Sequence, residues 1–368
     1  MPVLVAALSG RGLAAAARRA GADIVVADLF GDTDTQALAP WHRLPGSLAD
    51  GIGREAAGLV RELGPLDGIV YGGGFEGAPE LLRELARLAP LIGNTPETVA
   101  AVRDPQGFAE TLDRLGLPHP AIAATPGAEG LWLRKHRGGS GGTHIRPVDP
   151  ETAAAGPGEY FEAFARGTPF SALFAANGKA ARVIGRSVQW TDPSAEQPFR
   201  YGGCVGPVSV TRRRARWIDE ACDALAAGLG LRGLNSLDML VDGDDITILE
   251  VNPRPGATID IFDDGPLWLW DLHCRSARGE LPPAIAGDAR PLHAATILYA
   301  DRPRRVPAAM GWEPWVADIS PAGTRFEAGD PICTVLSTGP DLARARDQGR
   351  RRAEEVLHHL PELSPETA

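Results

Sequence analysis

The first hundred residues alternate between short apolar runs and segments with helical spacing, and this alternation limits the folds open to the chain. The apolar runs cover residues 3–8, 23–28 and 67–71, and the helical patterns cover residues 12–20, 52–63 and 79–88. Strands that alternate with helices predict a parallel sheet with helices on both faces. Ligands of such sheets bind beyond the carboxyl ends of the strands. The glycines at 72–74 follow the third run, where a substrate contact and a tight turn needing positive φ are equally good interpretations.

Size and charge narrow the class of protein. With 368 residues the chain exceeds one typical hydrophobic core, which predicts two or three lobes. A net charge of −10 argues against a general nucleic-acid surface, and no run approaches the ~20 apolar residues that span a bilayer. The apolar N-terminus has no basic leader, so we interpret it as a strand rather than a signal peptide. Four cysteines without metal-ligand spacing predict reduced thiols and a cytoplasmic location.

Three regions follow from the pattern along the chain. We predict a first domain over residues 1–93, a core over residues 94–284, and a β-rich region with a closing helix over residues 285–368. Within the core, a hairpin lid over about residues 131–175 carries a glycine run whose tip we expect to be mobile. A second hairpin, over about residues 233–254, turns near Gly243.

The second hairpin carries oxygen-bearing side chains on otherwise apolar strands. Side chains alternate between the faces of a strand, so Glu250 and Asn252 point the same way, and Asp238 falls close to register with Glu250. Carboxylates on an apolar sheet need a counter-charge. Hard oxygen ligands suit Mg²⁺, which combines one or two carboxylates with phosphate oxygens. The hairpin therefore predicts magnesium-bound ATP, and an exposed strand end is the alternative.

Two cations accompany this hairpin. Arg254 stands between Pro253 and Pro255, and a stiffly held guanidinium beside a metal can neutralise a transferring phosphoryl group. A structural salt bridge is the other interpretation of Arg254. Lys135 precedes the glycine run at 138–142, whose backbone N–H groups can approach phosphates.

Together these pieces resemble the ATP-grasp superfamily, over roughly residues 1–275 and most strongly at residues 249–254. The resemblance implies an α/β fold with a Rossmann-like N-terminal domain, a two-lobed nucleotide-binding core and a small β-rich C-terminal region. It implies ATP and Mg²⁺ as cofactors, with Mn²⁺ as the alternative ion, and an enzyme that releases ADP. Its implied metal ligands are Asp238, Glu250 and Asn252, and its catalytic side chains are Arg254 and Lys135. Its implied nucleotide contacts are Lys135, Gly139, Ser140, Gly141, Gly142, Thr143 and Glu250 around the phosphates, and Glu162, Ala163 and Phe164 at the adenine.

One departure concerns the phosphates. The family often has Asp-Lys where this chain has Asp104-Pro105, so a second phosphate-binding lysine is missing, and Arg103 is the neighbouring cation. His136 and His144 flank the glycine run, where a structural role and a phosphate contact are both open. The residues that the family places near the acceptor substrate correspond here to Gln189, Arg200, Tyr201, Gly202 and Gly203.

The resemblance also implies a reaction. ATP-grasp enzymes phosphorylate a carboxylate and let an amine attack the acyl phosphate, so small carboxylate and amine substrates are expected, with a homodimer as an open assembly. The tail around residues 329–333 resembles ATP-grasp proteins of methanofuran-type one-carbon cofactor biosynthesis, some of which join glutamate to an aromatic amine such as tyramine. The tail is also similar to the C-terminal barrel of biotin carboxylase, which leaves a bicarbonate-phosphorylating enzyme as an alternative. A nucleotide-binding regulator without turnover is the third interpretation.

Overall fold

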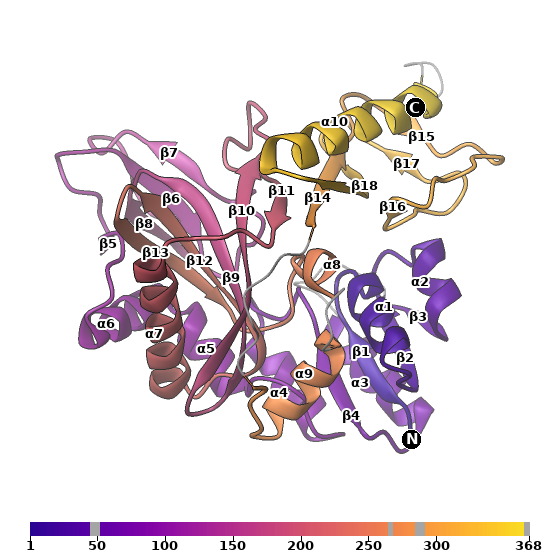
Figure 1. Ribbon diagram of the computed structural model, residues 1–368, viewed down its shortest axis with the longest axis horizontal. Coiled ribbons are helices and arrows are strands. Elements are labelled where there is room, and N and C mark those ends of the chain that lie inside the picture. The colour runs from indigo at the N-terminus through magenta and orange to yellow at the C-terminus, as the bar shows by residue number, and fades with distance from the viewer. Residues whose placement is uncertain (45–51, 264–267, 284–290, 364–368) are drawn as a thin grey trace.

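The N-terminal domain is built on a parallel sheet. The computed structural model describes residues 1–44, 52–263, 268–283 and 291–363, and Figure 1 shows their arrangement. Four strands run in the order β3-β2-β1-β4, and all their pairings are parallel, as the alternating pattern predicted. The strands are β1 (Val3–Ala6), β2 (Ile24–Asp28), β3 (Trp41–Arg43) and β4 (Gly68–Tyr71). The helices are α1 (Arg11–Arg19), α2 (Thr33–Leu38), α3 (Ile52–Leu63) and α4 (Pro79–Ala86).

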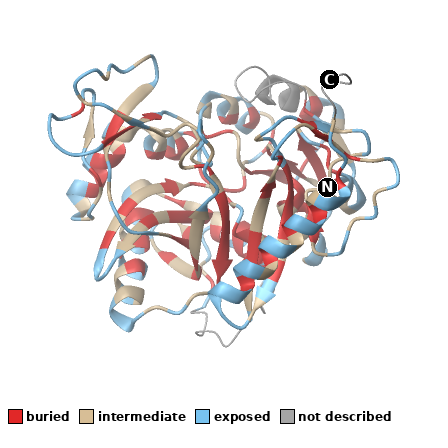
Figure 2. Ribbon diagram, turned by 90° about the horizontal axis from the view of Figure 1, so that it is seen from above, coloured by how far each residue is buried: buried red, intermediate tan, exposed pale blue. Residues whose placement is uncertain are grey.

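Side-chain alternation gives this sheet two buried faces. Val5 and Val26 point into the core shared with α1, whereas Leu4 and Ile69 point into the core on the opposite face. Burying each such side chain stabilises the fold by about 1.5–3 kcal/mol. Figure 2 shows buried residues along the strands and exposed residues along the outer faces of the helices.

A large antiparallel sheet forms the centre of the molecule. Its eight strands run in the order β13-β12-β9-β10-β11-β14-β18-β16. They are β9 (Thr168–Asn177), β10 (Ala181–Thr191), β11 (Tyr201–Gly206), β12 (Arg232–Asp242), β13 (Asp245–Asn252), β14 (Leu292–Tyr299), β16 (Val316–Ala317) and β18 (Pro331–Gly339). Helix α7 (Arg212–Leu229) buries Ile218 and Leu225 against one face, and α8 (Ile259–Phe262) and α9 (Leu269–Ala277) join the other face to the N-terminal domain.

A smaller antiparallel sheet forms the lid. Its order is β5-β8-β6-β7, with β5 (Ile122–Ala123), β6 (Trp132–His136), β7 (Arg146–Val148) and β8 (Glu159–Ala163). Two helices precede it, α5 (Pro96–Arg103) and α6 (Pro105–Leu115). The Asp104-Pro105 pair has a local explanation, because the Asp104 carboxylate accepts the Gly107 N–H at 3.1 Å and Pro105 is the first residue of α6.

The C-terminal region extends the central sheet. Strands β14 and β18 pair with each other and β14 pairs with β11, so these strands do not form a separate cap. Strands β15 (Arg304–Arg305) and β17 (Arg325–Phe326) form a small ladder, and α10 (Leu342–His359) is the predicted closing helix. The predicted boundary near residues 284–285 lies outside the described residues. The pattern could not reveal the shared sheet, because the β11–β14 pairing joins strands about ninety residues apart.

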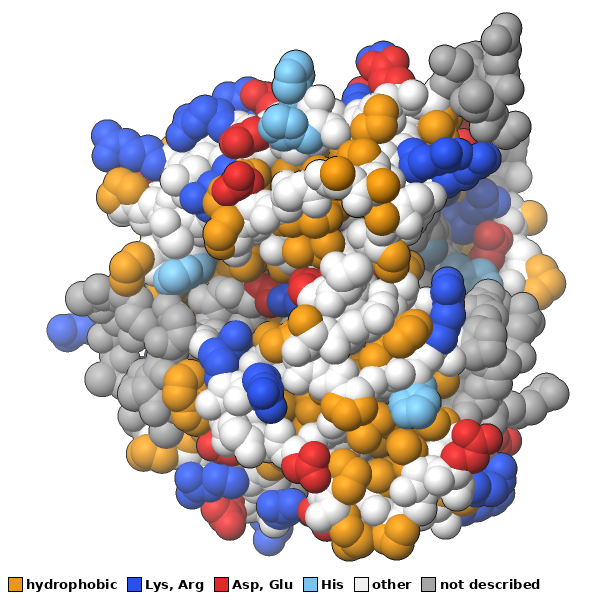
Figure 3. All heavy atoms as spheres, turned by 90° about the vertical axis from the view of Figure 1, so that its right-hand side faces the viewer, with side chains coloured by type: hydrophobic (Ala, Val, Ile, Leu, Met, Phe, Trp, Pro, Cys, Tyr) orange, Lys and Arg blue, Asp and Glu red, His pale blue; other side chains and the backbone are white. Residues whose placement is uncertain are grey.

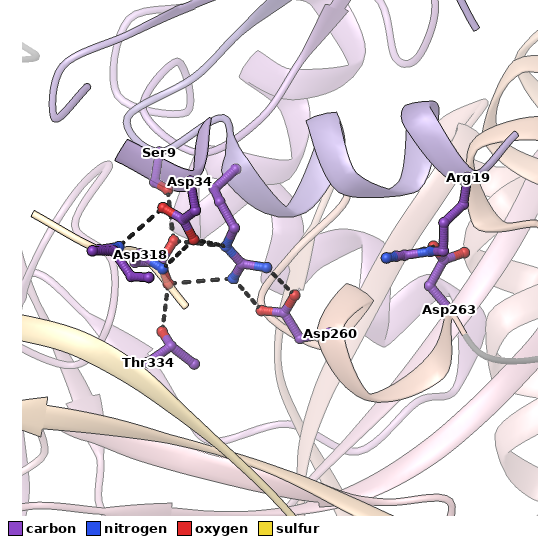
Figure 4. A network of polar contacts seen from close by, with 9 residues as sticks. Ser9, Arg19, Asp34, Asp260, Asp263, Asp318 and Thr334 are labelled. Carbon is purple, nitrogen blue, oxygen red and sulfur yellow. Dashed lines mark hydrogen bonds and ion pairs between the residues drawn. The ribbon is translucent and has the colours of Figure 1, made fainter. Parts of the chain in front are cut away.

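One arginine ties three parts of the chain together. Arg11 makes a two-pronged ion pair with Asp260, at 2.5 and 2.6 Å, and its Nε donates to Asp318 at 3.0 Å. The Asp34 carboxylate accepts the N–H of Asp318 at 2.9 Å, and Thr334 donates to Asp318 at 2.5 Å. Figure 4 shows Asp34, Asp260 and Asp318 converging from separate elements. Figure 3 views the molecule from the right-hand side of Figure 1, and acidic and basic side chains lie in a recess near the centre of that view. The N-terminal domain, the segment after β13 and the C-terminal region are thereby fixed to one another.

A second junction, which we name the seam, consists of Tyr71, Asn94, Asn235 and His273. Asn94 Nδ2 donates to Asn235 Oδ1 at 2.7 Å, and Tyr71 Oη donates to the Asn94 carbonyl at 2.9 Å. His273 Nδ1 accepts the Leu234 N–H at 3.0 Å, which leaves the proton on Nε2 to bind the Ile92 carbonyl at 2.8 Å. All four side chains are buried and paired.

We examined the length and apolar character of the helices in the part of the chain that the structure describes. None of them is both long enough and apolar enough to cross a bilayer.

Candidate active site

The hairpin of β12 and β13 brings the predicted metal ligands together. Asp238 lies opposite Glu250 in the antiparallel register, as the spacing predicted, and Ser236 lies opposite Asn252. Asn252 Nδ2 donates to Asp238 Oδ2 at 2.9 Å, and Ser171 Oγ of β9 donates to Asp238 Oδ1 at 2.6 Å. The ladder shifts register directly after Asp238, at a β-bulge, a feature that often re-aims side chains at functional sites.

The charge balance of this hairpin is unfavourable without a cation. Burial, followed by the neighbouring Glu250 carboxylate, raises the pKa of Asp238 to about 7. Two carboxylates and one amide oxygen are the hard donors that Mg²⁺ prefers, with phosphate oxygens completing its shell. Among the described residues no group of three or more acidic, histidine or cysteine side chains forms a complete metal cage. These residues therefore fit a metal that is shared with a phosphate ligand.

Arg103, two residues before the position where the family often has a lysine, lies beside the hairpin carboxylates. It is the last residue of α5, its side chain is 10% exposed, and Nη1 lies 3.2 Å from Glu250 Oε2. Nη2 donates to the Gly139 carbonyl at 2.6 Å, and the buried Nε has no partner among the described residues. The sequence identified Arg103 only as a neighbouring cation, because its approach to Glu250 depends on packing between elements 147 residues apart.

Arg254 is held by an acidic residue that the sequence analysis did not identify. Its Nε is paired with Glu76, which follows β4, and its Nη1 donates to the Pro255 carbonyl at 3.2 Å. Burial would raise the pKa of Glu76, but the charges of Arg254 and Arg103 outweigh it and hold that pKa at about 2. The salt-bridge interpretation of Arg254 is therefore present in the structure. The glycine triplet before Glu76 lies at the carboxyl end of a parallel strand, and this position could have marked Glu76 as a candidate site residue.

Lys135 is also paired. Its Nζ lies 2.5 Å from Glu162 Oε1, and both side chains are almost fully buried. Burial raises the pKa of Glu162, and the Lys135 charge partly offsets this rise. Ala163 N–H donates to the Ala121 carbonyl at 2.9 Å and Phe164 N–H to the Leu131 carbonyl at 2.8 Å, so both donors are used within the lid. Adenine binding at residues 162–164 stays a prediction.

A cleft lies between α5, α6, the lid and β13. Apolar side chains such as Phe108 and Leu249 line one part, and charged side chains such as Arg103 and Glu250 line another. An apolar wall beside fixed charges is typical of a nucleotide pocket. Of the predicted residues, the cleft lining includes Gly139, Glu162 and Glu250. It does not include Lys135, Ser140, Gly141, Gly142, Thr143, Ala163, Phe164, Asp238, Asn252 or Arg254.

Two other predicted positions have clear surroundings. His144 lines the cleft, and burial lowers its pKa to about 4, so its ring is neutral near pH 7. Gln189 of β10 approaches Asp238 at 3.4 Å, as an acceptor-side residue would. The Arg200 guanidinium, in contrast, is bonded to Asp192 at 2.7 Å and is buried. It is therefore not free to hold a substrate.

Sequence comparison agrees with this geometry. Residues 103–258, which contain the lid and the β12–β13 hairpin, match a family model described as an ATP-grasp domain. The large chain of carbamoyl phosphate synthase from Rubrobacter xylanophilus is 24% identical over an alignment of 228 residues, and the match covers 55% of this chain and 21% of that one. The chain therefore spans about a fifth of the length of the curated relatives that it matches.

Solved structures match over nearly the whole chain. One is the biotin carboxylase domain of 2-oxoglutarate carboxylase from Hydrogenobacter thermophilus, a dimer in complex with MgADP and bicarbonate. Its TM-score is 0.74 at 14% identity, and the match covers 96% of this chain and 89% of that one. The L-amino acid ligase of Bacillus licheniformis has a TM-score of 0.73 at 16% identity and covers 99% of both chains. The chain thus has the mixed α/β ATP-grasp fold that the sequence predicted.

Proposed function

We propose that this protein is an ATP-dependent carboxylate–amine ligase that forms an amide through an acyl phosphate and releases ADP. The observation that carries the proposal is the convergence of Asp238, Glu250 and Asn252 on one hairpin face, with Arg103 against Glu250. Two adjacent carboxylates with a single directly paired arginine suit magnesium-bound phosphates better than an apolar ligand. The domain match and the ligase among the structural neighbours support the same reaction type.

In this proposal the nucleotide lies in the cleft between the lid and β13. Asp238, Glu250 and Asn252 hold Mg²⁺, with Mn²⁺ as the alternative, and the ion neutralises phosphate charge when bound. Arg103 takes the role of the missing lysine at the phosphates. Its Nε, unpartnered among the described residues, and its contact with Glu250 support this role. Lys135 and the residues from Gly139 to Thr143 complete the phosphate contacts, and residues 162–164 border the adenine.

The chemistry proceeds in two displacements. A substrate carboxylate oxygen attacks the γ-phosphorus of ATP, the bond to the β-phosphate oxygen breaks, and ADP leaves. The amine nitrogen then attacks the acyl carbon, inorganic phosphate leaves, and the nitrogen loses a proton. Arg254 lies beside the carboxyl end of β4, where its guanidinium stabilises charge on the transferring phosphoryl group while Glu76 fixes its orientation. The enzyme contributes by positioning the substrates and by stabilising the charge of the transferring phosphoryl group.

The finer identity of the substrates is also part of the proposal. The carboxylate is glutamate and the acceptor is a small amine, within the synthesis of a methanofuran-type one-carbon cofactor in the cytoplasm. The resemblance of the C-terminal tail supports this choice. The proposed assembly is a homodimer, which the dimeric carboxylase domain among the neighbours favours.

A second candidate is a bicarbonate-phosphorylating enzyme. It is favoured by the likeness to biotin carboxylase domains, which extends over 96% of this chain and includes the C-terminal strands. A regulator without turnover is less well supported, because Arg103 supplies a cation where the lysine is missing.

A matrix of carboxylates and amines, assayed for ADP and for amide by mass spectrometry, tests the proposal. We expect ADP and amide only where both substrates are present, and glutamate to be the preferred carboxylate. ADP release with bicarbonate and no amine would establish the carboxylase instead. Tight ATP binding with no ADP under any combination would contradict both enzymes. Glu250→Gln serves as the control that assigns the activity to this hairpin.

A further inference from the structure

The tip of the lid is seated on the rest of the molecule. We name residues 138–143 the glycine loop. Its Gly141 carbonyl accepts the Tyr201 N–H at 2.8 Å, and its Gly139 carbonyl accepts Arg103 Nη2 at 2.6 Å. The bond from Tyr201 is notable because that residue begins β11 of the central sheet, outside the lid. The tip that the sequence predicted to be mobile is therefore docked in this structure.

Close packing accompanies these bonds. A Cβ atom added at Gly142 would overlap the carbonyl oxygen of Phe199, and one at Gly138 would lie 2.5 Å from Gly77 Cα. A Cβ atom at Gly141 would meet nothing within 4 Å. Gly141 and Gly142 have similar positive φ angles, of 63° and 71°. We name residues 199–201 the docking segment. The backbone of the glycine loop packs directly against the backbone of this segment.

The docking segment is held rigid by groups that touch no part of the cleft. Arg200 Nε donates to the Asp192 carbonyl at 2.9 Å, Nη2 pairs with the Asp192 carboxylate at 2.7 Å, and Nη1 reaches the Gly329 carbonyl at 3.3 Å. The guanidinium also lies 3.7 Å above the ring of Tyr299. Tyr299 Oη in turn donates to the Tyr201 carbonyl at 2.8 Å. Two of these partners, Tyr299 and Gly329, belong to the C-terminal region.

We propose that Arg200 and Tyr299 are positioning residues that let the C-terminal region anchor the closed lid. They fix the docking segment so that the Tyr201 N–H and the Phe199 carbonyl receive the glycine loop. The proposal rests on the ligase function, because closure matters most when an acyl phosphate must be protected from water. Their catalytic effect is indirect, since the Arg200 guanidinium is occupied by structural partners and touches no reacting atom. Variants with weaker docking should therefore release more ADP for each amide formed, while the rate of ATP use changes less.

Two glycine variants and two clamp variants test this role. Gly142→Ala and Gly141→Ala carry the same cost of an alanine at positive φ and differ only in the collision with Phe199. Arg200→Lys removes the planar fork but keeps the charge, and Tyr299→Phe removes only the hydroxyl. Two quantities are measured in each: hydrogen exchange at the Tyr201 amide in the free protein, and moles of ADP released per mole of amide.

The expected result separates the variants. Relative to Gly141→Ala, Gly142→Ala should exchange the Tyr201 amide at least tenfold faster and release at least threefold more ADP per amide. Arg200→Lys and Tyr299→Phe should shift both quantities in the same direction, with the KM for ATP within twofold of the unmodified enzyme. Equal exchange in the two glycine variants, or an unchanged ADP-to-amide ratio in Gly142→Ala and Arg200→Lys, would overturn the proposal. An unmodified enzyme that makes no amide would refute the ligase function, while the exchange comparison would still decide whether the loop docks as described.

Discussion

The seam is a buried group of polar side chains and the active site a partly buried one, and the two balance their polar side chains differently. In the seam, Asn94 and Asn235 bond to each other, and both nitrogens of His273 have backbone partners. On the β12–β13 hairpin, Asp238 and Glu250 lie side by side, and burial with the neighbouring charge raises the pKa of Asp238 to about 7. Nearby, Arg103 Nε is buried without a partner among the described residues.

This difference separates residues that hold the fold from residues that we propose bind a ligand. Buried polar groups are costly unless bonded, so a fully paired group such as the seam stabilises a junction between domains. Like charges held together cost stability unless a ligand offsets them, and such perturbed groups are typical of functional sites. Changes in the seam should therefore reduce stability, and changes in the hairpin should reduce activity.

The largest expected effect is on turnover by Glu250→Gln. Replacing this carboxylate removes a metal ligand and should lower kcat by roughly a thousandfold, equivalent to about 4 kcal/mol. The melting temperature should stay within a few degrees, because Glu250 is 43% exposed and the amide keeps its shape. Steady-state ADP release and thermal unfolding check both parts. Glu220→Gln, on the exposed face of α7, is the matched control, and equal kcat in the two variants would remove Glu250 from the metal site.

The next effect is a pH dependence of stability that arises in the seam. Burial lowers the pKa of His273 from 6.5 to about 4 in the folded protein, so between these values the unfolded chain binds the extra proton. The neutral ring's contribution is fully present above pH 6.5 and is lost as the pH falls toward 4, by up to about 3 kcal/mol. Denaturant unfolding from pH 7 to pH 4 should show this slope in the unmodified protein and a shallower one in His273→Gln. Parallel slopes in the two proteins would contradict the assignment.

A smaller loss of stability is expected for Asn235→Ala. It removes the acceptor of Asn94 Nδ2 and leaves other buried groups unsatisfied, at a cost of roughly 2 kcal/mol. The KM for ATP should change less than twofold, because the seam does not line the cleft. Denaturant unfolding together with ADP kinetics measures both quantities. A large rise in KM without a loss of stability would reverse the roles of the two regions.

The smallest effect in free energy is expected at Arg103. Arg103→Met should raise the KM for ATP by roughly tenfold through loss of a phosphate contact, about 1.4 kcal/mol. Arg103→Lys should recover part of this loss, since the charge returns without the planar fork. Arg83→Met, at an exposed ion pair with Glu97, is the matched control. If Arg103→Met binds ATP as tightly as Arg83→Met, then Arg103 does not replace the missing lysine.

Local patterns predicted the parts of the site that lie on one hairpin. Alternation along two strands joined at Gly243 fixed the faces of Asp238 and Glu250, and their register in the structure agrees. The same logic predicted the parallel N-terminal sheet. Neighbours in sequence determine these features, so a single sequence contains them.

Contacts between distant segments were beyond that logic. The Glu76 partner of Arg254 is 178 residues away, and the strands that continue the central sheet into the C-terminal region pair across about ninety residues. The pairing of the Arg200 guanidinium with Asp192 and Gly329, and the docking of the glycine loop, likewise depend on tertiary packing. Sequence alone therefore predicted the pairing within the β12–β13 hairpin and missed how the surrounding residues hold the arginines and the lid.

The central claim is that the β12–β13 hairpin binds nucleotide through a divalent ion. Calorimetric titration with a non-hydrolysable ATP analogue, with and without Mg²⁺, tests it directly in the unmodified protein and in Asp238→Asn. We expect the affinity of the unmodified protein to rise at least tenfold with Mg²⁺, and Asp238→Asn to lose most of that gain while remaining folded. Equal affinities with and without Mg²⁺ in the unmodified protein, or the full gain retained in Asp238→Asn, would contradict the account.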